Sequence, residues 1–169
     1  MKIFLDTANI ASIKLYNDMG LLDGITTNPS LLAKEGGDPQ KTMEEIVRIV
    51  KGDVSLEVIA TDASGMVEEG RRLRKYGKNV VVKCPLTPDG LKSCRILTDE
   101  GIPVNVTLCF STNQAILAAK SGAKYVSPFI GRLDDVGQDG MSLIKEIHEV
   151  FKNYQYGTQI LVASVRHPM

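Results

Sequence analysis

A β-branched run that leads into a lysine and stops at a proline, Asn79-Val80-Val81-Val82-Lys83-Cys84-Pro85, gives the clearest structural signal in this sequence. A short apolar run that ends at a breaker is typical of a strand buried on both faces of a parallel sheet. A buried ammonium group without a partner is unfavourable. Two functions suit such a lysine at a strand end, namely anion binding or attack of a neutral amine on a carbonyl to form a Schiff base. The alternative is a lysine whose amine reaches solvent where the strand leaves the sheet.

The composition indicates one globular domain over residues 1–169. Hydrophobic residues make up 43% and charged residues 24% of the chain, and 20 basic residues balance 20 acidic residues without a basic run. We therefore expect neither nucleic acid nor membrane as a partner. The first residues lack the features of a signal peptide, and no apolar run approaches the length of a membrane span. A cytoplasmic location is the corresponding expectation.

The cysteines and histidines give little support for a metal site. Cys84, Cys94 and Cys109 lack the spacing of a zinc site or of a redox pair. His148 and His167 are too far apart in sequence to suggest a shared ligand set. The sequence therefore predicts reduced cysteines that pack in the core, with no metal and no cofactor.

Strand and helix patterns alternate along the chain. Strands are expected to begin near seven positions, which are Lys2, Gly24, Val54, Asn79, Pro103, Lys124 and Thr158. Helices are expected over residues 10–19, 38–51, 64–76, 88–100, 111–121 and 139–154. Such regular alternation predicts a parallel sheet with right-handed crossovers.

An open doubly wound sheet and a closed (β/α)8 TIM barrel both fit this alternation, and the polar residues favour the barrel. In each strand a polar residue falls late; these residues are Asp6, Asn28, Glu57, Lys83, Thr107, Ser127 and Ser164. Their neighbours of opposite parity are apolar and are expected to pack under helices; they include Leu5, Val58, Val80, Val82, Val104, Val106, Leu108 and Val126. Polar groups at the carboxyl ends of all strands are typical of the active-site end of a barrel, whereas an open sheet gathers them at one switch point.

Seven strands leave a (β/α)8 barrel one strand short. A full barrel commonly needs about 200 or more residues, and this sequence ends at Met169, directly after the seventh predicted strand. We therefore expect the barrel domain 1–169 to be truncated at its carboxyl end, without its eighth strand and terminal helix. An incomplete barrel, or one that a partner closes, stays open as the alternative.

The polar residues together supply the parts of Schiff-base chemistry. They comprise an amine, two carboxyls, a hydroxyl and two amides, from Lys83, Asp6, Glu57, Thr107, Asn28 and Asn105. Attack on a carbonyl requires the neutral amine, which desolvation favours. Two ionised carboxylates nearby would oppose this, so at least one of them is expected to be protonated or held by hydrogen bonds.

Five motifs of this sequence resemble the transaldolase family. They are Phe4-Leu5-Asp6-Thr7-Ala8, Gly24-Ile25-Thr26-Thr27-Asn28-Pro29-Ser30, Val82-Lys83-Cys84-Pro85, Asn105-Val106-Thr107 and Tyr125-Val126-Ser127-Pro128-Phe129. The match covers essentially the whole chain in order. It is most similar to the small-subunit branch, which also contains the fructose 6-phosphate aldolases.

The resemblance implies four catalytic residues. Lys83 would form the Schiff base, and Asp6 would handle the proton of the hydroxyl at the cleaved bond. Glu57 and Thr107 would hold a catalytic water. The family relationship also implies a homo-oligomer, a ring of subunits that a terminal helix locks together.

The resemblance further implies a set of substrate-binding residues, which are Asn28, Asn105, Ser127, Phe129, Arg132, Ser164 and Arg166. The two asparagines would orient the dihydroxyacetone unit, with Ser127 nearby. The two arginines and Ser164 would grip the phosphate. Sugar phosphates are thus the expected small-molecule partners.

Structural alternatives exist for several of these residues. Asp6 is also suited to cap the following helix, and Asn28-Pro29 to form only a turn. Asn105 and Thr107 are equally suited to be hydrogen-bonded polar residues of the core.

The basic residues also have simpler interpretations. Arg132 is followed by acidic residues and so suits a surface ion pair, and Arg166 suits a solvated chain end. Lys2, Lys14 and Lys34 are given no role in the site.

The leading functional hypothesis is a transaldolase of the pentose phosphate pathway. It would transfer a dihydroxyacetone unit from fructose 6-phosphate or sedoheptulose 7-phosphate to erythrose 4-phosphate or glyceraldehyde 3-phosphate. The alternatives are an aldolase that releases free dihydroxyacetone and a barrel that binds sugar phosphates without Schiff-base chemistry. In the family pattern the aldolases carry glutamine at the position of Glu57 and tyrosine at the position of Phe129, and this difference favours transfer.

Overall fold

The computed structural model of the chain describes residues 1–167 and contains seven strands within them. The strands are β1 (Phe4–Asp6), β2 (Gly24–Thr26), β3 (Asp53–Glu57), β4 (Val80–Pro85), β5 (Val104–Cys109), β6 (Tyr125–Pro128) and β7 (Gln159–Ile160). Each strand pairs in parallel with the next one along the chain, in the order β1 to β7. All seven begin within two residues of the predicted positions.

Eight helices connect the strands of the described chain. They are α1 (Ile10–Asp18), α2 (Pro29–Glu35), α3 (Pro39–Ile49), α4 (Ala63–Arg74), α5 (Pro88–Asp99), α6 (Thr112–Lys120), α7 (Ile130–Asp134) and α8 (Gly140–Asn153). The six predicted helices are present, with ends that differ by at most two residues. The short helices α2 and α7 were not predicted, because seven and five residues hold too few turns for a helical period to be visible.

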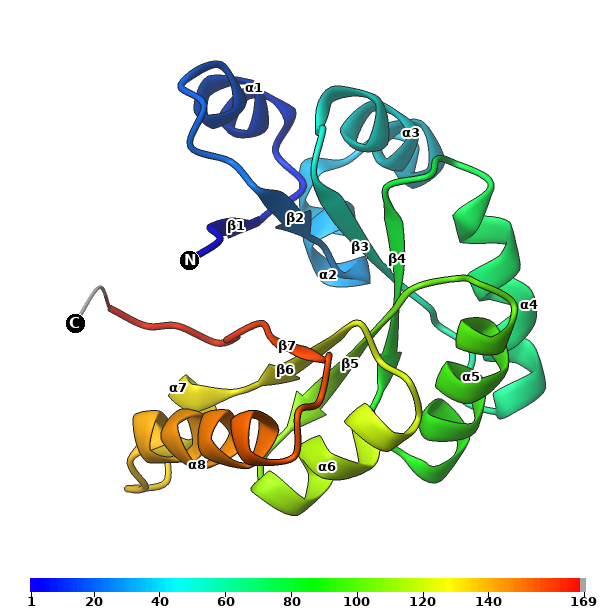
Figure 1. Ribbon diagram of the computed structural model, residues 1–169. Helices are drawn as coiled ribbons and strands as arrows, with labels where there is room; N and C mark the ends of the chain where they lie inside the picture. The colour runs from blue at the N-terminus through cyan, green and yellow to red at the C-terminus, as the bar shows by residue number, and fades with distance from the viewer. Residues whose placement is uncertain (168–169) are drawn as a thin grey trace.

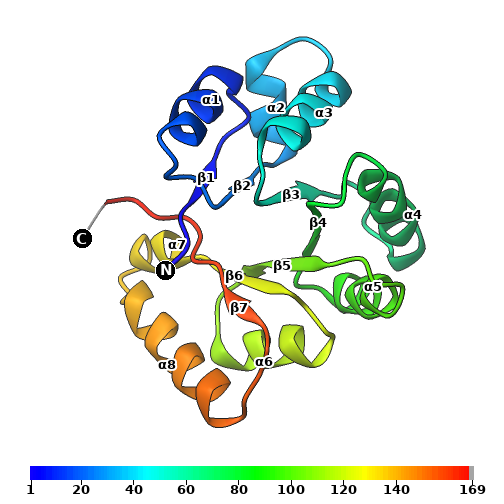
Figure 2. The same cartoon turned by 45° about the horizontal axis from the view of Figure 1, so that its top comes forward.

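The sheet curls into a partial (β/α)8 barrel. Figure 1 shows the strands side by side with helices on their convex side, and Figure 2 shows the strands gathered at the centre with the longer helices around them. The sheet edges β1 and β7 border the open side. This architecture agrees with the predicted barrel, of which seven strands lie in residues 1–167; the predicted domain also included residues 168–169, which lie outside the described residues. None of the helices in the described chain is long and apolar enough to cross a membrane.

The core lies between the outer face of the sheet and the helices. Apart from Leu108, the apolar strand residues that were predicted to pack under helices do so, with Leu5 partly buried at the edge; those that are fully or nearly fully buried are Val58, Val80, Val82, Val104, Val106 and Val126. Burial of this outward face on every strand is the reason that the polar residues of the other parity face the barrel interior.

The parity prediction is wrong for Leu108. Its side chain is 42% exposed, and its backbone has a φ of 63°. The pairing of β5 with β6 shifts between Val106 and Cys109, so β5 contains one extra residue at a β-bulge. Beyond the bulge the alternation is reversed, and Cys109 takes the buried outward position that Leu108 was expected to fill.

Polar contacts close the barrel at the amino ends of the strands. The Tyr125 hydroxyl donates to Asp53 Oδ2 at 2.6 Å, and Lys124 Nζ lies 2.5 Å from the same oxygen. The Phe4 ring packs edge-on against Tyr125 with 5.7 Å between ring centres. Burial, with the Asp53 carboxylate adding to it, raises the pKa of Tyr125 well above its ordinary value. The polar residues of the candidate site lie at the opposite end of the barrel interior, at the carboxyl ends of the strands.

Candidate active site

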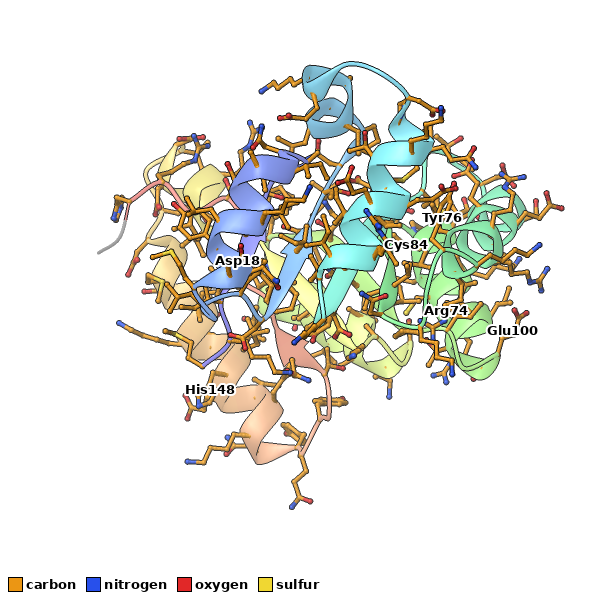
Figure 3. All side chains as sticks on the ribbon, turned by 90° about the horizontal axis from the view of Figure 1, so that it is seen from above. Asp18, Arg74, Tyr76, Cys84, Glu100 and His148 are labelled. Atoms are coloured by element: carbon orange, nitrogen blue, oxygen red, sulfur yellow. The ribbon has the colours of Figure 1, made fainter. Side chains whose placement is uncertain are left out.

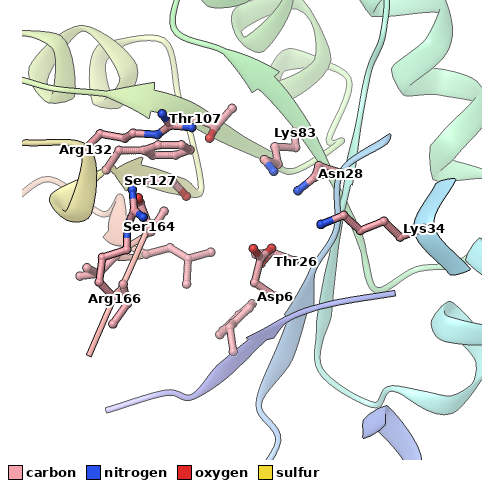
Figure 4. A pocket seen from close by; sticks show the side chains of 16 residues that line it. Asp6, Thr26, Asn28, Lys34, Lys83, Thr107, Ser127, Arg132, Ser164 and Arg166 are labelled. Carbon is pink, nitrogen blue, oxygen red and sulfur yellow. The ribbon is translucent and has the colours of Figure 1, made fainter. Parts of the chain in front are cut away.

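A cavity of about 670 Å³ lies at the carboxyl ends of the strands (Figure 4). All predicted site residues except Glu57 and Asn105 line this cavity. The lining residues that were predicted are Asp6, Asn28, Lys83, Thr107, Ser127, Phe129, Arg132, Ser164 and Arg166. A neighbouring cavity of about 410 Å³ shares Lys83 and Thr107 with the first and adds Glu57. Active sites of (β/α) barrels occupy this end of the fold.

Lys83 is buried near the carboxyl end of β4 and makes two polar contacts. Only 8% of the residue is exposed. Its Nζ lies 3.0 Å from Glu57 Oε2 and donates to the Thr27 carbonyl oxygen at 3.0 Å. β3 and β4 are paired so that Glu57 lies directly beside Lys83. The amine therefore does not turn to bulk solvent, which was the alternative for this strand.

Thr107 lines both cavities and carries a buried, unpaired hydroxyl. Among the described residues its Oγ1 is the one buried side-chain nitrogen or oxygen without a hydrogen-bond partner, and the residue is 1% exposed. A buried polar group without a partner costs about 1–3 kcal/mol. The alternative of a hydrogen-bonded core residue is thus wrong for Thr107, because its hydroxyl has no partner within the described residues.

Asn105 belongs to a buried hydrogen-bond chain beneath the cavity. Its Nδ2 donates to Ser55 Oγ at 3.3 Å, and its Oδ1 accepts from Ser127 Oγ at 2.9 Å. Asn105 is fully buried, so its interpretation as a satisfied core residue fits the contacts. Ser127 lines the cavity, and the asparagine fixes the direction of that hydroxyl.

Asp6 and Asn28 face the cavity in different ways. Asp6 Oδ1 accepts from Thr26 Oγ1 at 2.7 Å, and the following helix α1 is capped by Asn9. The capping alternative for Asp6 is therefore wrong. Asn28 does cap a helix, because its Oδ1 accepts from the backbone N–H of Leu31 at 2.9 Å at the start of α2. This contact uses only the amide oxygen of Asn28, so the N–H groups of its side chain keep no partner in the cap. Figure 4 shows the Asn28 side chain in the cavity close to Lys83.

Arg132, Ser164 and Arg166 form one side of the cavity (Figure 4). Helix α7 carries Arg132, and the segment after β7 carries the other two. This segment lies against α7, where Gly131 N donates to Ser164 O at 3.0 Å. A Cβ atom at Gly131 would clash with the Ser164 carbonyl and with Arg166, so the close approach requires glycine.

The arginines differ in their partners. Arg166 Nη2 lies 2.7 Å from Asp135 Oδ2, so Arg166 is not simply a solvated end. Asp135 thereby takes the arginine after β7 as its partner, although Arg132 is closer to it in sequence. No ion pair is found for Arg132 within residues 1–167, so its predicted surface ion pair is absent there.

Two polar residues of the larger cavity were missed by the sequence reasoning. Thr26 and Lys34 line the cavity, and Lys34 had been given no role. Figure 4 shows the Lys34 side chain pointing toward the cavity from the side of Asn28, opposite the arginines. Lys34 sits in the last turn of α2, so the missed helix concealed its position. Lys14 pairs with Glu45 at 3.0 Å on the surface.

The thiols lie in the core outside the site. Burial raises the pKa of Cys84 to about 12 and the pKa of Cys94 and Cys109 to about 11. They are free and buried, as predicted. Figure 3 shows His148 well apart from Cys84, and the described chain holds no cluster of three metal-ligating side chains.

By its fold and site, this protein is a (β/α) barrel with a cavity at the carboxyl ends of its strands. A buried lysine, carboxylates and arginines surround that cavity. The family model for transaldolase/fructose-6-phosphate aldolase matches residues 3–169. The chain belongs to this family.

Relatives support the same assignment. The chain is 75% identical over 170 residues to a "Probable transaldolase" of Nitrosopumilus maritimus (strain SCM1), covering 100% of this chain and 77% of the relative. It is 62% identical to a protein of that name from Methanococcus maripaludis (strain C7 / ATCC BAA-1331), covering 100% and 79%. It is 57% identical to another from Aquifex aeolicus (strain VF5), covering 100% and 78%.

Proposed function

We propose that this protein is a transaldolase that carries a dihydroxyacetone unit on Lys83. The donors are fructose 6-phosphate or sedoheptulose 7-phosphate, and the acceptors are erythrose 4-phosphate or glyceraldehyde 3-phosphate, in the pentose phosphate pathway. The single observation that carries the proposal is the buried Lys83 amine 3.0 Å from the Glu57 carboxylate, beside the unpaired Thr107 hydroxyl. An amine used only to hold an anion would gain nothing from an adjacent carboxylate.

Formation of the Schiff base uses Glu57 and Thr107. The ammonium of Lys83 passes a proton to Glu57, and the neutral amine attacks the carbonyl carbon of the ketose. The carbonyl oxygen then leaves as water after taking two protons, for which the Glu57 carboxyl is the nearest acid. We assign the holding of this water to the Thr107 hydroxyl, because Thr107 lines the same small cavity as Glu57 and Lys83.

Cleavage uses Asp6. The hydroxyl on the carbon beyond the breaking bond loses its proton to the carboxylate, and an aldose phosphate leaves as an aldehyde. The electron pair of the broken carbon–carbon bond moves toward the iminium nitrogen and forms an enamine on Lys83. Asp6 lines the larger cavity with Lys83, and its Oδ1 is oriented by Thr26. The acceptor aldehyde reverses these steps.

Arg132, Ser164 and Arg166 serve the phosphate of donor and acceptor. Guanidinium groups bind phosphate oxygens in a bidentate geometry. Arg166 keeps its direction through Asp135, while Arg132 is without an acidic partner in the described chain. Asn28 and Ser127 line the cavity, and we assign them to the dihydroxyacetone unit, with Asn105 orienting Ser127 by accepting a hydrogen bond from its hydroxyl.

Phe129 favours transfer over release. It lines both cavities and packs edge-on against Phe110 with 5.8 Å between ring centres. A phenyl ring has no proton to give to the enamine, whereas a tyrosine hydroxyl there would. The enamine is therefore retained until an aldehyde arrives, which supports transaldolase over aldolase.

Borohydride trapping tests the proposal. Reduction with fructose 6-phosphate present should fix a sugar adduct on the wild type and on Lys14→Met, a surface control, but not on Lys83→Met. Equal labelling of all three, or of none, would favour a barrel that only binds sugar phosphates. Release of dihydroxyacetone by the wild type without acceptor, as fast as transfer to erythrose 4-phosphate, would favour the aldolase.

The same proposal includes a cytoplasmic homo-oligomer. The exposed apolar side chains Ile3 and Val165, near the open side of the barrel, suit a contact between subunits. Light scattering behind size-exclusion chromatography measures the assembly directly, and a monomer at micromolar concentration would contradict this part.

A further inference from the structure

The β-bulge in β5 places a leucine where a glycine would be the expected residue. Thr107 and Leu108 of β5 lie opposite the single residue Ser127 of β6, because the pairing passes from Val106 directly to Cys109. The φ of Leu108 is 63°, in the left-handed region. Glycine adopts this region freely and asparagine tolerates it, while a branched side chain there is strained.

Burial does not compensate this strain. Leu108 is 42% exposed, and it belongs to neither buried apolar cluster of the described chain. An unstrained residue would therefore serve the fold at least as well as leucine does. Strained residues of this kind gather at functional sites, so we expect Leu108 to act on the residues around it.

The Leu108 side chain lines the small cavity around Lys83. The same cavity is lined by Glu57, Thr107 and Phe129, so Leu108 and Phe129 contribute apolar surface next to the reacting amine. Without the bulge, Leu108 would follow the parity of Val106 and point under the helices. The left-handed residue thus turns an apolar side chain from the outer face of β5 to the site.

We propose that Leu108 is a specificity-determining residue that keeps water from the enamine carbon and so favours transfer over release. The inference rests on the proposed Schiff-base function. Release consumes one water overall. One hydrogen of this water bonds to the enamine carbon, its oxygen becomes the ketone oxygen of dihydroxyacetone, and its other hydrogen ends on the Lys83 nitrogen as the carbon–nitrogen bond breaks. An apolar wall on the Leu108 side of the cavity slows the first of these events, because it offers no proton donor and keeps bulk solvent from the enamine carbon, while the water assigned to Glu57 and Thr107 serves the imine.

Two truncations separate the side chain from the backbone strain. Leu108→Ala removes the wall and keeps a strained left-handed residue, whereas Leu108→Gly removes both the wall and the strain. Both variants should raise the ratio of dihydroxyacetone release to transfer by about tenfold, below the range of a positioned acid. Leu108→Met, which restores apolar volume, should return the ratio to within about twofold of the wild type. If Leu108→Gly does not fold, Leu108→Asn replaces it.

Gln155→Gly is the matched control. Gln155 is exposed, has a φ of 54° and lies in the turn after α8, away from both cavities. Relief of its strain should change the melting temperature, by about 2–4 °C per kcal/mol for a chain of this size, and leave the release-to-transfer ratio unchanged.

The ratio is measured with fructose 6-phosphate, with and without erythrose 4-phosphate. An unchanged ratio in both truncations, while the borohydride adduct still forms on Lys83, would overturn the inference and leave the proposed function intact. A wild type that forms no adduct would overturn both. If the release-to-transfer ratio rises in Leu108→Gly but not in Leu108→Ala, the backbone conformation and not the side chain controls release. This result would also overturn the inference.

Discussion

Replacement of Glu57 by glutamine tests the pair at the centre of the site. Glu57→Gln keeps the shape of the side chain and removes the negative charge 3.0 Å from Lys83 Nζ. The Coulomb attraction at this distance is about 5–6 kcal/mol with an effective dielectric constant of ~20. Loss of one partner of a buried pair typically costs about 3–5 kcal/mol.

We expect Glu57→Gln to lower the free energy of unfolding by less than either of these two energies. The glutamine oxygen still accepts a hydrogen bond from the lysine, and the Glu57 side chain is 23% exposed, so solvent replaces part of the lost interaction. We expect a loss of about 2 kcal/mol, the size of a hydrogen bond to a charged group. The melting temperature should fall by roughly 4–8 °C.

Transfer activity should fall further than stability. An amide cannot exchange protons with the water formed at the imine, so transfer from fructose 6-phosphate to erythrose 4-phosphate should slow by about 10²-fold or more. Calorimetry and a coupled assay measure the two effects. Glu100→Gln is the control, because Glu100 pairs with Arg71 on the outer surface and its replacement should leave transfer unchanged. Transfer by Glu57→Gln within threefold of the wild type, at equal stability, would refute the role of the pair.

Three other substitutions or treatments give sharp outcomes. Arg132→Ala should raise the KM for phosphorylated donors and barely affect reactions of unphosphorylated dihydroxyacetone, because the arginine acts on the phosphate; equal losses on both would contradict its assignment. Phe129→Tyr, alone or with Glu57→Gln, should shift the enzyme toward release, so that the ratio of dihydroxyacetone release without an acceptor to transfer rises in a coupled reductase assay; an unchanged ratio would argue against proton delivery from this position. Burial raises the pKa of Cys84 from its ordinary value of about 9.0 to about 12, so the thiol should resist iodoacetamide at pH 8 until the protein unfolds. The contribution of this thiol to the free energy of unfolding is present below about pH 9 and is lost as the pH rises toward 12. Urea unfolding at pH 8 and at pH 10.5 would detect this loss.

The strands and their faces were readable from the sequence alone. β-branched residues, breakers and the two-residue alternation act over a few neighbouring residues, so they located β4 and placed Lys83 on the interior face. The order of strands followed from the regular alternation with helices. The same local rule brought residues as distant as Asp6 and Arg166 to one cavity, because they lie at or beyond the carboxyl ends of parallel strands.

The tertiary structure alone decided how these residues are paired and oriented. The bulge that turns Leu108 to the cavity is a mismatch between β5 and β6, and a strand's own sequence does not state its register with a neighbour. The partner of Arg166 is Asp135, 31 residues away, and Lys34 reaches the cavity from a helix too short to show a period. Such contacts join residues that are distant along the chain. Their geometry depends on the packing of whole elements, and no local pattern of side chains carries that information.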